Sequence, residues 1–114
     1  SLHLDPLSES ARRRQAIELI ETLRNRARPL IVMGDFNCGC SSQEFKYLIE
    51  RTNLQGAHCD MMTFPSWRPV RRIDHILVSH SIEVRSTRVV DYALSDHLPI
   101  CVELVLPESV RLAA

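Results

Sequence analysis

The hydrophobic positions in the first quarter of the chain first alternate as in a strand and then recur at helical spacing. Residues 2–4 alternate as a strand does, and Pro6 ends that pattern. Ser8 is a suitable N-cap for a helix that ends at about Arg28, because Pro29 disfavours helical geometry at the residue before it. The pattern predicts a short strand and then an amphipathic helix whose apolar stripe comprises Ala16, Ile17, Ile20, Leu23 and Ala27.

The next segments repeat this order of strand and helix. Residues 30–33 are a continuous apolar run, the pattern of a strand covered on both faces, and residues 34–37 form a polar turn. Ser41 or Ser42 is expected to cap a second helix, with residues 53–62 forming a loop that has at most a short strand. The apolar positions of that helix are Phe45, Leu48 and Ile49.

The second half of the chain predicts strands. Residues 73–78 are mainly apolar, residues 82–91 alternate as an edge strand does, and a loop at residues 95–97 precedes the last strand. One face of that strand carries Leu98, Ile100, Val102, Leu104 and Leu106. The order predicts a mixed α/β or α+β layer forming one domain over residues 1–114, without repeats or an internal boundary.

Composition narrows the classes of partner. The 114 residues suffice for one domain with a modest core, and the formal net charge is zero. This charge argues against a strongly basic protein that coats DNA without specificity, although local basic clusters can still meet phosphates. No stretch has the length of a transmembrane helix.

The four cysteines, Cys38, Cys40, Cys59 and Cys101, contain no Cys-x-x-Cys pair. The favoured interpretation is unpaired thiols in a reducing cytoplasm. A disulfide is one alternative, and a structural zinc ion held by Cys38, Cys40, His58 and Cys59 is another.

The first candidate for chemistry is the turn at Gly34, Asp35 and Asn37. Residues two apart in extended chain share a face, so Asp35 and Asn37 can point into one pocket. A carboxylate that orients water beside an amide that holds an oxygen suits phosphoryl or metal chemistry. The alternative is an Asx turn that only closes the strand.

The second candidate joins Asp74 with His97. Asp74 lies in an apolar strand, where a buried carboxylate needs a partner, although a solvent-facing position is the alternative. His97 follows Asp96, and adjacent residues rarely bond each other, so Asp74 is expected to orient His97. His75 is expected to pack or face solvent, and Ser95 lacks the Gly-x-Ser-x-Gly context of a nucleophile.

Four segments together, residues 2–4, 34–37, 72–76 and 95–100, resemble the endonuclease/exonuclease/phosphatase superfamily. It includes deoxyribonucleases, abasic-site endonucleases, deadenylases, sphingomyelinases and inositol polyphosphate phosphatases. The resemblance covers nearly the whole chain. It implies the C-terminal half of a four-layer α/β/β/α sandwich with mixed, mainly antiparallel sheets, and hydrolysis of phosphoesters that depends on a divalent metal.

The resemblance also implies roles for individual residues. His3 would contact the scissile phosphate, Asp35 would position or activate water, and Asn37 would bind phosphate. Asp74 would orient His97, which would bind a phosphoryl oxygen or assist proton transfer.

Mg²⁺ or Mn²⁺ is the implied metal, with Asp35 and Asp96 beside it. The family holds its metal mainly through an asparagine and a glutamate in the N-terminal half of the domain, and nothing before His3 supplies them. The resemblance therefore implies a fragment that is inactive alone and whose partner is the missing half. An uncovered apolar sheet face is expected to drive self-association.

The substrate is open among phosphoesters. Trp67 is a candidate for stacking on a base or sugar, and Arg68 or Arg72 for contacting a phosphate. The alternative is a Trp67 that packs on the sheet and arginines that are solvated. A phosphodiester is favoured, with nucleic acid ahead of lipid. The alternatives are a phospholipid or inositol-phosphate phosphoesterase, and a non-catalytic binding module that retains the fold.

Overall fold

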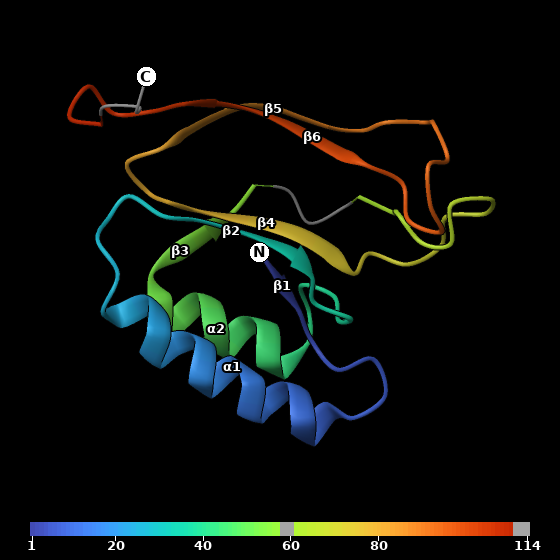
Figure 1. Ribbon diagram of the computed structural model, residues 1–114, viewed down its shortest axis with the longest axis horizontal. Helices are drawn as coiled ribbons and strands as arrows, with labels where there is room; N and C mark the ends of the chain where they lie inside the picture. The colour runs from blue at the N-terminus through green and yellow to red at the C-terminus, as the bar shows by residue number, and fades with distance from the viewer. Residues whose placement is uncertain (58–60, 111–114) are drawn as a thin grey trace.

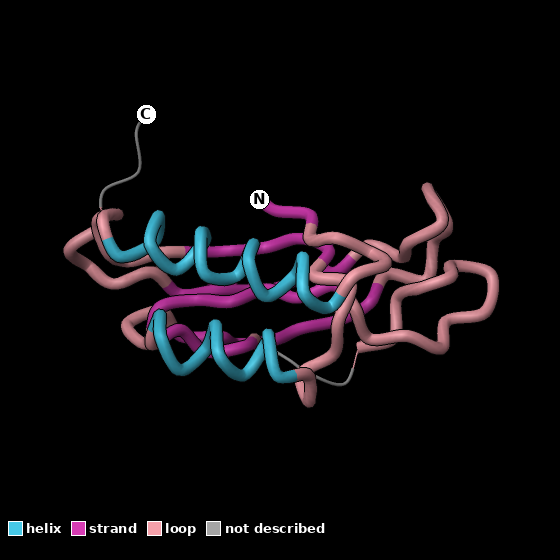
Figure 2. The backbone as a smooth tube through the Cα atoms, turned by 90° about the horizontal axis from the view of Figure 1, so that it is seen from below, coloured by secondary structure: helices cyan, strands magenta, loops and turns pink. Residues whose placement is uncertain are grey.

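Two helices lie side by side on one face of a four-stranded sheet, and a two-stranded sheet lies over its other face (Figures 1 and 2). The computed structural model describes residues 1–57 and 61–110. The helices are α1 (Glu9–Arg24) and α2 (Gln43–Thr52). The strands are β1 (Leu2–His3), β2 (Ile31–Asp35), β3 (Leu54–Gly56), β4 (Asp74–Ser79), β5 (Glu83–Val89) and β6 (Ile100–Val105). The predicted mixed α+β class is confirmed.

The larger sheet has the strand order β1-β2-β4-β3. β1 pairs with β2 in parallel, whereas β2–β4, β3–β4 and the separate β5–β6 pair are antiparallel. The sheets are thus mixed and mainly antiparallel, as expected. Together with the helices they form the layer order helix, sheet, sheet.

The helix boundaries follow from their caps. The Ser8 hydroxyl accepts the Ala11 N–H at 3.1 Å, and the Ser42 hydroxyl accepts the Phe45 N–H at 3.2 Å. α2 ends at Thr52, and its C-cap Asn53 adopts the left-handed conformation with φ 54°. The predicted caps and the short strand after α2 are confirmed.

The prediction that the first helix continues to about Arg28 is wrong, because α1 ends at Arg24 with Asn25 as its C-cap. The Asn25 side chain donates to the Glu21 carbonyl at 3.2 Å and so satisfies one of the final helical acceptors. Ala27 therefore does not belong to the helical stripe.

Two apolar clusters hold the layers together. The cluster between helices and sheet includes Leu23, Val32, Phe45, Leu48 and Leu77. The cluster between the sheets is built on Ile76, Val78 and Ile82, with Val84, Ile100, Val102, Leu104 and Leu106 against it. β4 serves both clusters because successive side chains on a strand point to opposite faces.

β2 is buried on one face and only partly covered on the other, so the prediction of a strand covered on both faces is wrong. Val32 is buried, whereas Ile31 is 39% exposed and Met33 is 44% exposed. Ile31 pairs with Val78 and Met33 with Ile76, which places all four side chains on the face toward the second sheet. The second sheet covers β4 and leaves β2 partly open.

The cysteines differ from one another. Cys38 is buried and free, and Cys101 is exposed and free. Cys40 is disulfide-bonded, so the interpretation of unpaired thiols is wrong for this residue. His58 and Cys59, which the zinc alternative needs, lie outside the described residues.

Among the described residues, no helix is long and apolar enough to cross a membrane.

Candidate active site

The site begins at Gly34, where β1 approaches β2 very closely. A side-chain carbon at Gly34 would lie 1.9 Å from the Leu2 carbonyl oxygen, and its φ of 151° is one that other residues rarely adopt. Only glycine permits this approach. It allows Leu2 to pair with Gly34 and His3 with Asp35, which brings the His3 imidazole beside the Asp35 carboxylate.

The two oxygens of Asp35 have different partners. Oδ1 accepts the Asn37 N–H at 2.8 Å, which is the bond of an Asx turn. Oδ2 lies 3.5 Å from His3 Nε2 and 3.6 Å from His97 Nε2. The Asx turn is therefore present, and it leaves Oδ2 facing the two histidines, so the chemical role of Asp35 stays a prediction.

Asn37 sits at the bend of the turn with φ 50°. Asparagine tolerates this left-handed conformation better than most residues. Its side-chain amide donates to the Leu4 carbonyl at 2.7 Å, so a group that the sequence predicts to bind phosphate is anchored to the segment after β1.

Asp74 and His97 make the contact that the sequence predicts. His97 Nδ1 lies 2.7 Å from Asp74 Oδ2, and because a carboxylate only accepts, the proton of this bond is on Nδ1. His97 Nε2 is thereby turned toward Asp35. Phe64 packs against the His97 ring with centroids 4.8 Å apart and supports its orientation.

Thr63 is a site residue that sequence reasoning missed. Its hydroxyl donates to Asp74 Oδ2, the same oxygen that accepts from His97. Its backbone N–H donates to the Arg71 carbonyl at 3.0 Å, and its carbonyl accepts the Leu98 N–H at 2.8 Å. Thr63 is fully buried and joins the segments that carry Asp74 and His97. No local pattern marks a lone threonine for such a role.

The charges around His97 favour its protonated form. Partial burial of the ring works against the charge, but the hydrogen bond and charge of Asp74, with the charges of Asp35 and Asp96, raise the pKa of His97 above its ordinary value. An imidazole whose protonated form is favoured in this way can bind an anion and supply a proton.

His75 packs in the core, as expected, and is not part of this cluster. Burial lowers the pKa of His75, and its Nε2 lies 2.7 Å from the Cys38 carbonyl. Phe36 and Phe45 lie against its ring at centroid distances of 5.2 and 4.6 Å. This histidine ties β4 to the turn that follows β2.

Asp35, Asp74 and His97 form a candidate metal site. One ligand atom from each lies within 4.8 Å of the others. The carboxylate oxygens of this group suit Mg²⁺ or Mn²⁺. Because Asp74 Oδ2 already accepts two hydrogen bonds, Asp35 Oδ2 is the more available oxygen.

The remaining predicted residues lie around this cluster and not in it. The Asp96 side chain is exposed and is not among the three grouped ligands, so its role at a metal stays a prediction. Trp67 is 77% exposed, which speaks against the alternative that it packs on the sheet. Arg68 and Arg72 are exposed, and Arg72 lines a depression beside the turn after β2. Their substrate contacts also stay predictions.

The model of the "Endonuclease/Exonuclease/phosphatase family" matches residues 3–97. The chain belongs to the endonuclease/exonuclease/phosphatase family. No curated protein matches significantly.

Solved structures similar to this family member share its fold. A mannosyl-6-phosphatase from Bacteroides thetaiotaomicron is 27% identical with a TM-score of 0.75, over 91% of this chain and 49% of that one. An endonuclease/exonuclease/phosphatase family protein from the same species is 25% identical with a TM-score of 0.78, over 98% and 50%. A conserved protein of unknown function from Enterococcus faecalis has a TM-score of 0.81 at 23% identity, over 93% and 48%. The chain thus spans about half the length of these relatives.

Proposed function

We propose that this chain carries the catalytic residues of a divalent-metal-dependent phosphoesterase that hydrolyses a phosphodiester by attack of water on phosphorus. One observation supports this most strongly. The free oxygen of Asp35 faces the Nε2 atoms of two histidines at 3.5 and 3.6 Å, while Asp74 holds the proton of His97 on the other nitrogen. A scaffold would not need this convergence.

In the proposed reaction the site residues activate water, bind the phosphate and transfer a proton. Asp35 Oδ2 orients the attacking water and accepts its proton. His3 Nε2 and the Asn37 amide contact the phosphate oxygens, where negative charge develops in the transition state. His97 binds a phosphoryl oxygen through Nε2 or transfers a proton there, and Asp74 stabilises the imidazolium.

Asp35, and Asp96 through direct or water-mediated contact, would hold Mg²⁺ or Mn²⁺. When bound, the ion would neutralise charge on the phosphoryl oxygens and the leaving group.

Exposed residues around the site are the candidates for selecting the substrate. The exposed Trp67 supports stacking on a base or sugar, and Arg68 and Arg72 support contact with further phosphates. A nucleic-acid phosphodiester is the first choice, and a lipid or inositol phosphate the next. The similarity to a mannosyl-6-phosphatase favours a sugar phosphomonoester as a second candidate.

We further propose that the 114-residue chain has little activity alone. It spans about half of its solved relatives. Two principal metal ligands are expected, from the family resemblance, in the other half of the domain. The chain's partner would then be that N-terminal half, and the open face of β2 would favour self-association without it.

The test is hydrolysis of generic phosphodiesters and phosphomonoesters by the full-length protein, with Mg²⁺, with Mn²⁺ and with chelator. A chelator-sensitive reaction that His97→Ala abolishes is expected, and the preferred ester selects between the two candidates. Absence of hydrolysis with both ester types and both metals would favour the non-catalytic binding module. Robust turnover by the 114-residue chain alone would refute the partial-domain proposal.

A further inference from the structure

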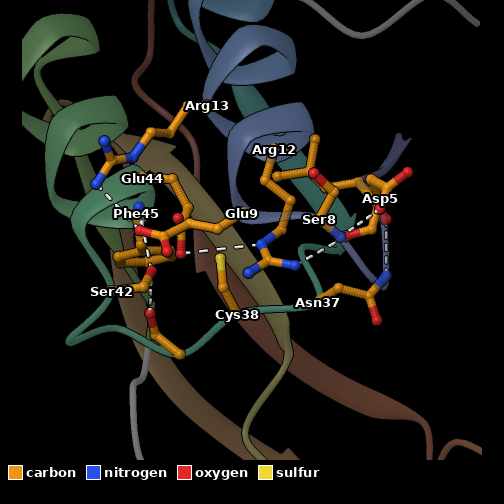
Figure 3. Close-up of polar contacts among 12 residues, drawn as sticks. Asp5, Ser8, Glu9, Arg12, Arg13, Asn37, Cys38, Ser42, Glu44 and Phe45 are labelled. Carbon is orange, nitrogen blue, oxygen red and sulfur yellow. Dashed lines mark hydrogen bonds and ion pairs between the residues drawn. The ribbon is translucent and has the colours of Figure 1, made fainter.

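Three side chains hold the two peptide units that follow β1. The Gln15 side chain accepts the Asp5 N–H at 2.8 Å. Arg12 Nη1 donates to the Asp5 carbonyl at 3.1 Å, and the Asn37 amide donates to the Leu4 carbonyl at 2.7 Å. Figure 3 shows Arg12 between Asp5 and Glu44, with Asn37 beside Asp5. Two successive carbonyls are thus fixed, one from α1 and one from the catalytic turn.

Arg12 makes its second contact with the start of α2. Arg12 Nε lies 3.9 Å from Glu44 Oε1, and their side chains are only 14% and 4% exposed. Glu44 is in the first turn of α2, where the helix dipole favours a carboxylate. Since α2 follows the turn that carries Asp35 and Asn37, Arg12 bridges the segment after β1 and the segment after β2.

Stability alone does not account for this buried pair. Arg12 Nε and Glu44 Oε2 are both buried without a hydrogen-bond partner among the residues described. A buried ion pair of this kind is commonly no more stabilising than apolar residues of the same volume. The ion pair instead fixes the orientation of the Arg12 side chain, because the planar guanidinium must face Glu44 and the Asp5 carbonyl together.

We propose that Arg12, held by Glu44, is a positioning residue that sets the Asn37 amide and the His3 ring against Asp35. It acts through the Leu4–Asp5 peptide and touches neither substrate nor reacting atoms. This inference rests on the proposed function, because Asn37 and His3 are substrate-binding groups only there.

The double variant Arg12→Met/Glu44→Leu separates positioning from stability. It removes both charges and leaves none unpaired, so the unfolding midpoint of the full-length protein is expected to stay near that of the parent. Hydrogen exchange of the Asn37 side-chain amide, followed by NMR, is expected to become about five- to tenfold faster as the Leu4–Asp5 segment loosens. The value of kcat should fall with little change in KM.

Arg13→Met is the matched control. Arg13 is the next residue and pairs on the surface with Glu9, so its loss should leave the Asn37 amide unchanged. Parent-like exchange in the double variant would overturn the proposal. If that variant does not fold, Arg12→Lys decides: it keeps a charge opposite Glu44 but lacks the fork, and parent-like exchange there would equally overturn it. A parent inactive on every ester would count against the proposed function, while the amide measurement would still decide the positioning.

Discussion

Asp35 and Asp74 lie directly opposite each other on the antiparallel strands β2 and β4. This register places two carboxylates on one face of the sheet, and His97 contacts both, Asp74 at 2.7 Å and Asp35 at 3.6 Å. One carboxylate is committed to orienting the imidazole and the other presents an oxygen to the site. Because the two carboxylates have different roles, substituting each of them is expected to have a different effect.

Asp35→Asn is expected to lower kcat/KM for phosphoester hydrolysis by about 10²- to 10⁴-fold, because the amide keeps the shape of the turn but cannot accept a proton from water. Steady-state kinetics of the full-length protein measures this. Asp91→Asn is the control, because Asp91 is exposed and is not one of the grouped residues Asp35, Asp74 and His97. Activity of Asp35→Asn within about threefold of the parent would contradict the role of a general base.

Thr63→Val is expected to raise the pKa of His97 further. Without the Thr63 hydroxyl, the charge of Asp74 is shared with one donor fewer and acts more strongly on the imidazolium. NMR titration of the His97 ring reports this directly. Thr63→Ser keeps the hydroxyl and should titrate like the parent. An unchanged pKa in the valine variant would mean that the threonine serves packing only.

Asp74→Asn is expected to lower the pKa of His97, because the residue that hydrogen-bonds its imidazole loses its charge.

The contact between Asp74 and His97 also makes the free energy of unfolding depend on pH. Since the folded-state pKa of His97 is raised above the ordinary 6.5, the contribution is complete below pH 6.5 and is lost as the pH rises through the raised value. Unfolding free energies of parent and Asp74→Asn, measured across that window, should converge at the alkaline end.

His75 has the opposite pH dependence. Burial lowers its folded-state pKa below 6.5, so the unfolded chain binds the proton more readily. The stability linked to His75 is present above pH 6.5 and falls as the pH drops through the lowered value. Denaturant unfolding of His75→Phe should show a smaller loss of stability in acid than the parent. A parallel loss in both proteins would assign acid sensitivity to other groups.

Mg²⁺ or Mn²⁺ is expected to stabilise the full-length protein through the Asp35 site. At a concentration one hundred times the dissociation constant, binding adds about 2.7 kcal/mol to the free energy of unfolding. Thermal unfolding with and without the ion measures this, and Asp35→Asn should remove most of the shift. An equal shift in parent and variant would place the ion elsewhere.

The 114-residue chain is expected to self-associate through the open face of β2. Ile31 and Met33 are exposed there on the face that β4 buries against the second sheet. Sedimentation of the isolated chain should show oligomers that Met33→Ser reduces, with Val70→Ser, exposed elsewhere, as the control. A monomeric parent would count against this surface.

Much of the fold and part of the site followed from the sequence because they depend on local rules. Ser8 and Ser42 cap their helices, and the apolar periods locate the strands. The apolar setting of Asp74 demanded a partner, and the predicted contact with His97 is present.

The tertiary structure decided what depends on contacts between distant segments. Thr63 meets Asp74, and Arg12 meets Asp5 and Glu44, only after several elements have packed. The half-covered β2 reflects where a second sheet comes to lie, which an apolar run cannot specify. Periodicity records which face of an element is apolar, whereas strand register and packing determine which side chains meet across it.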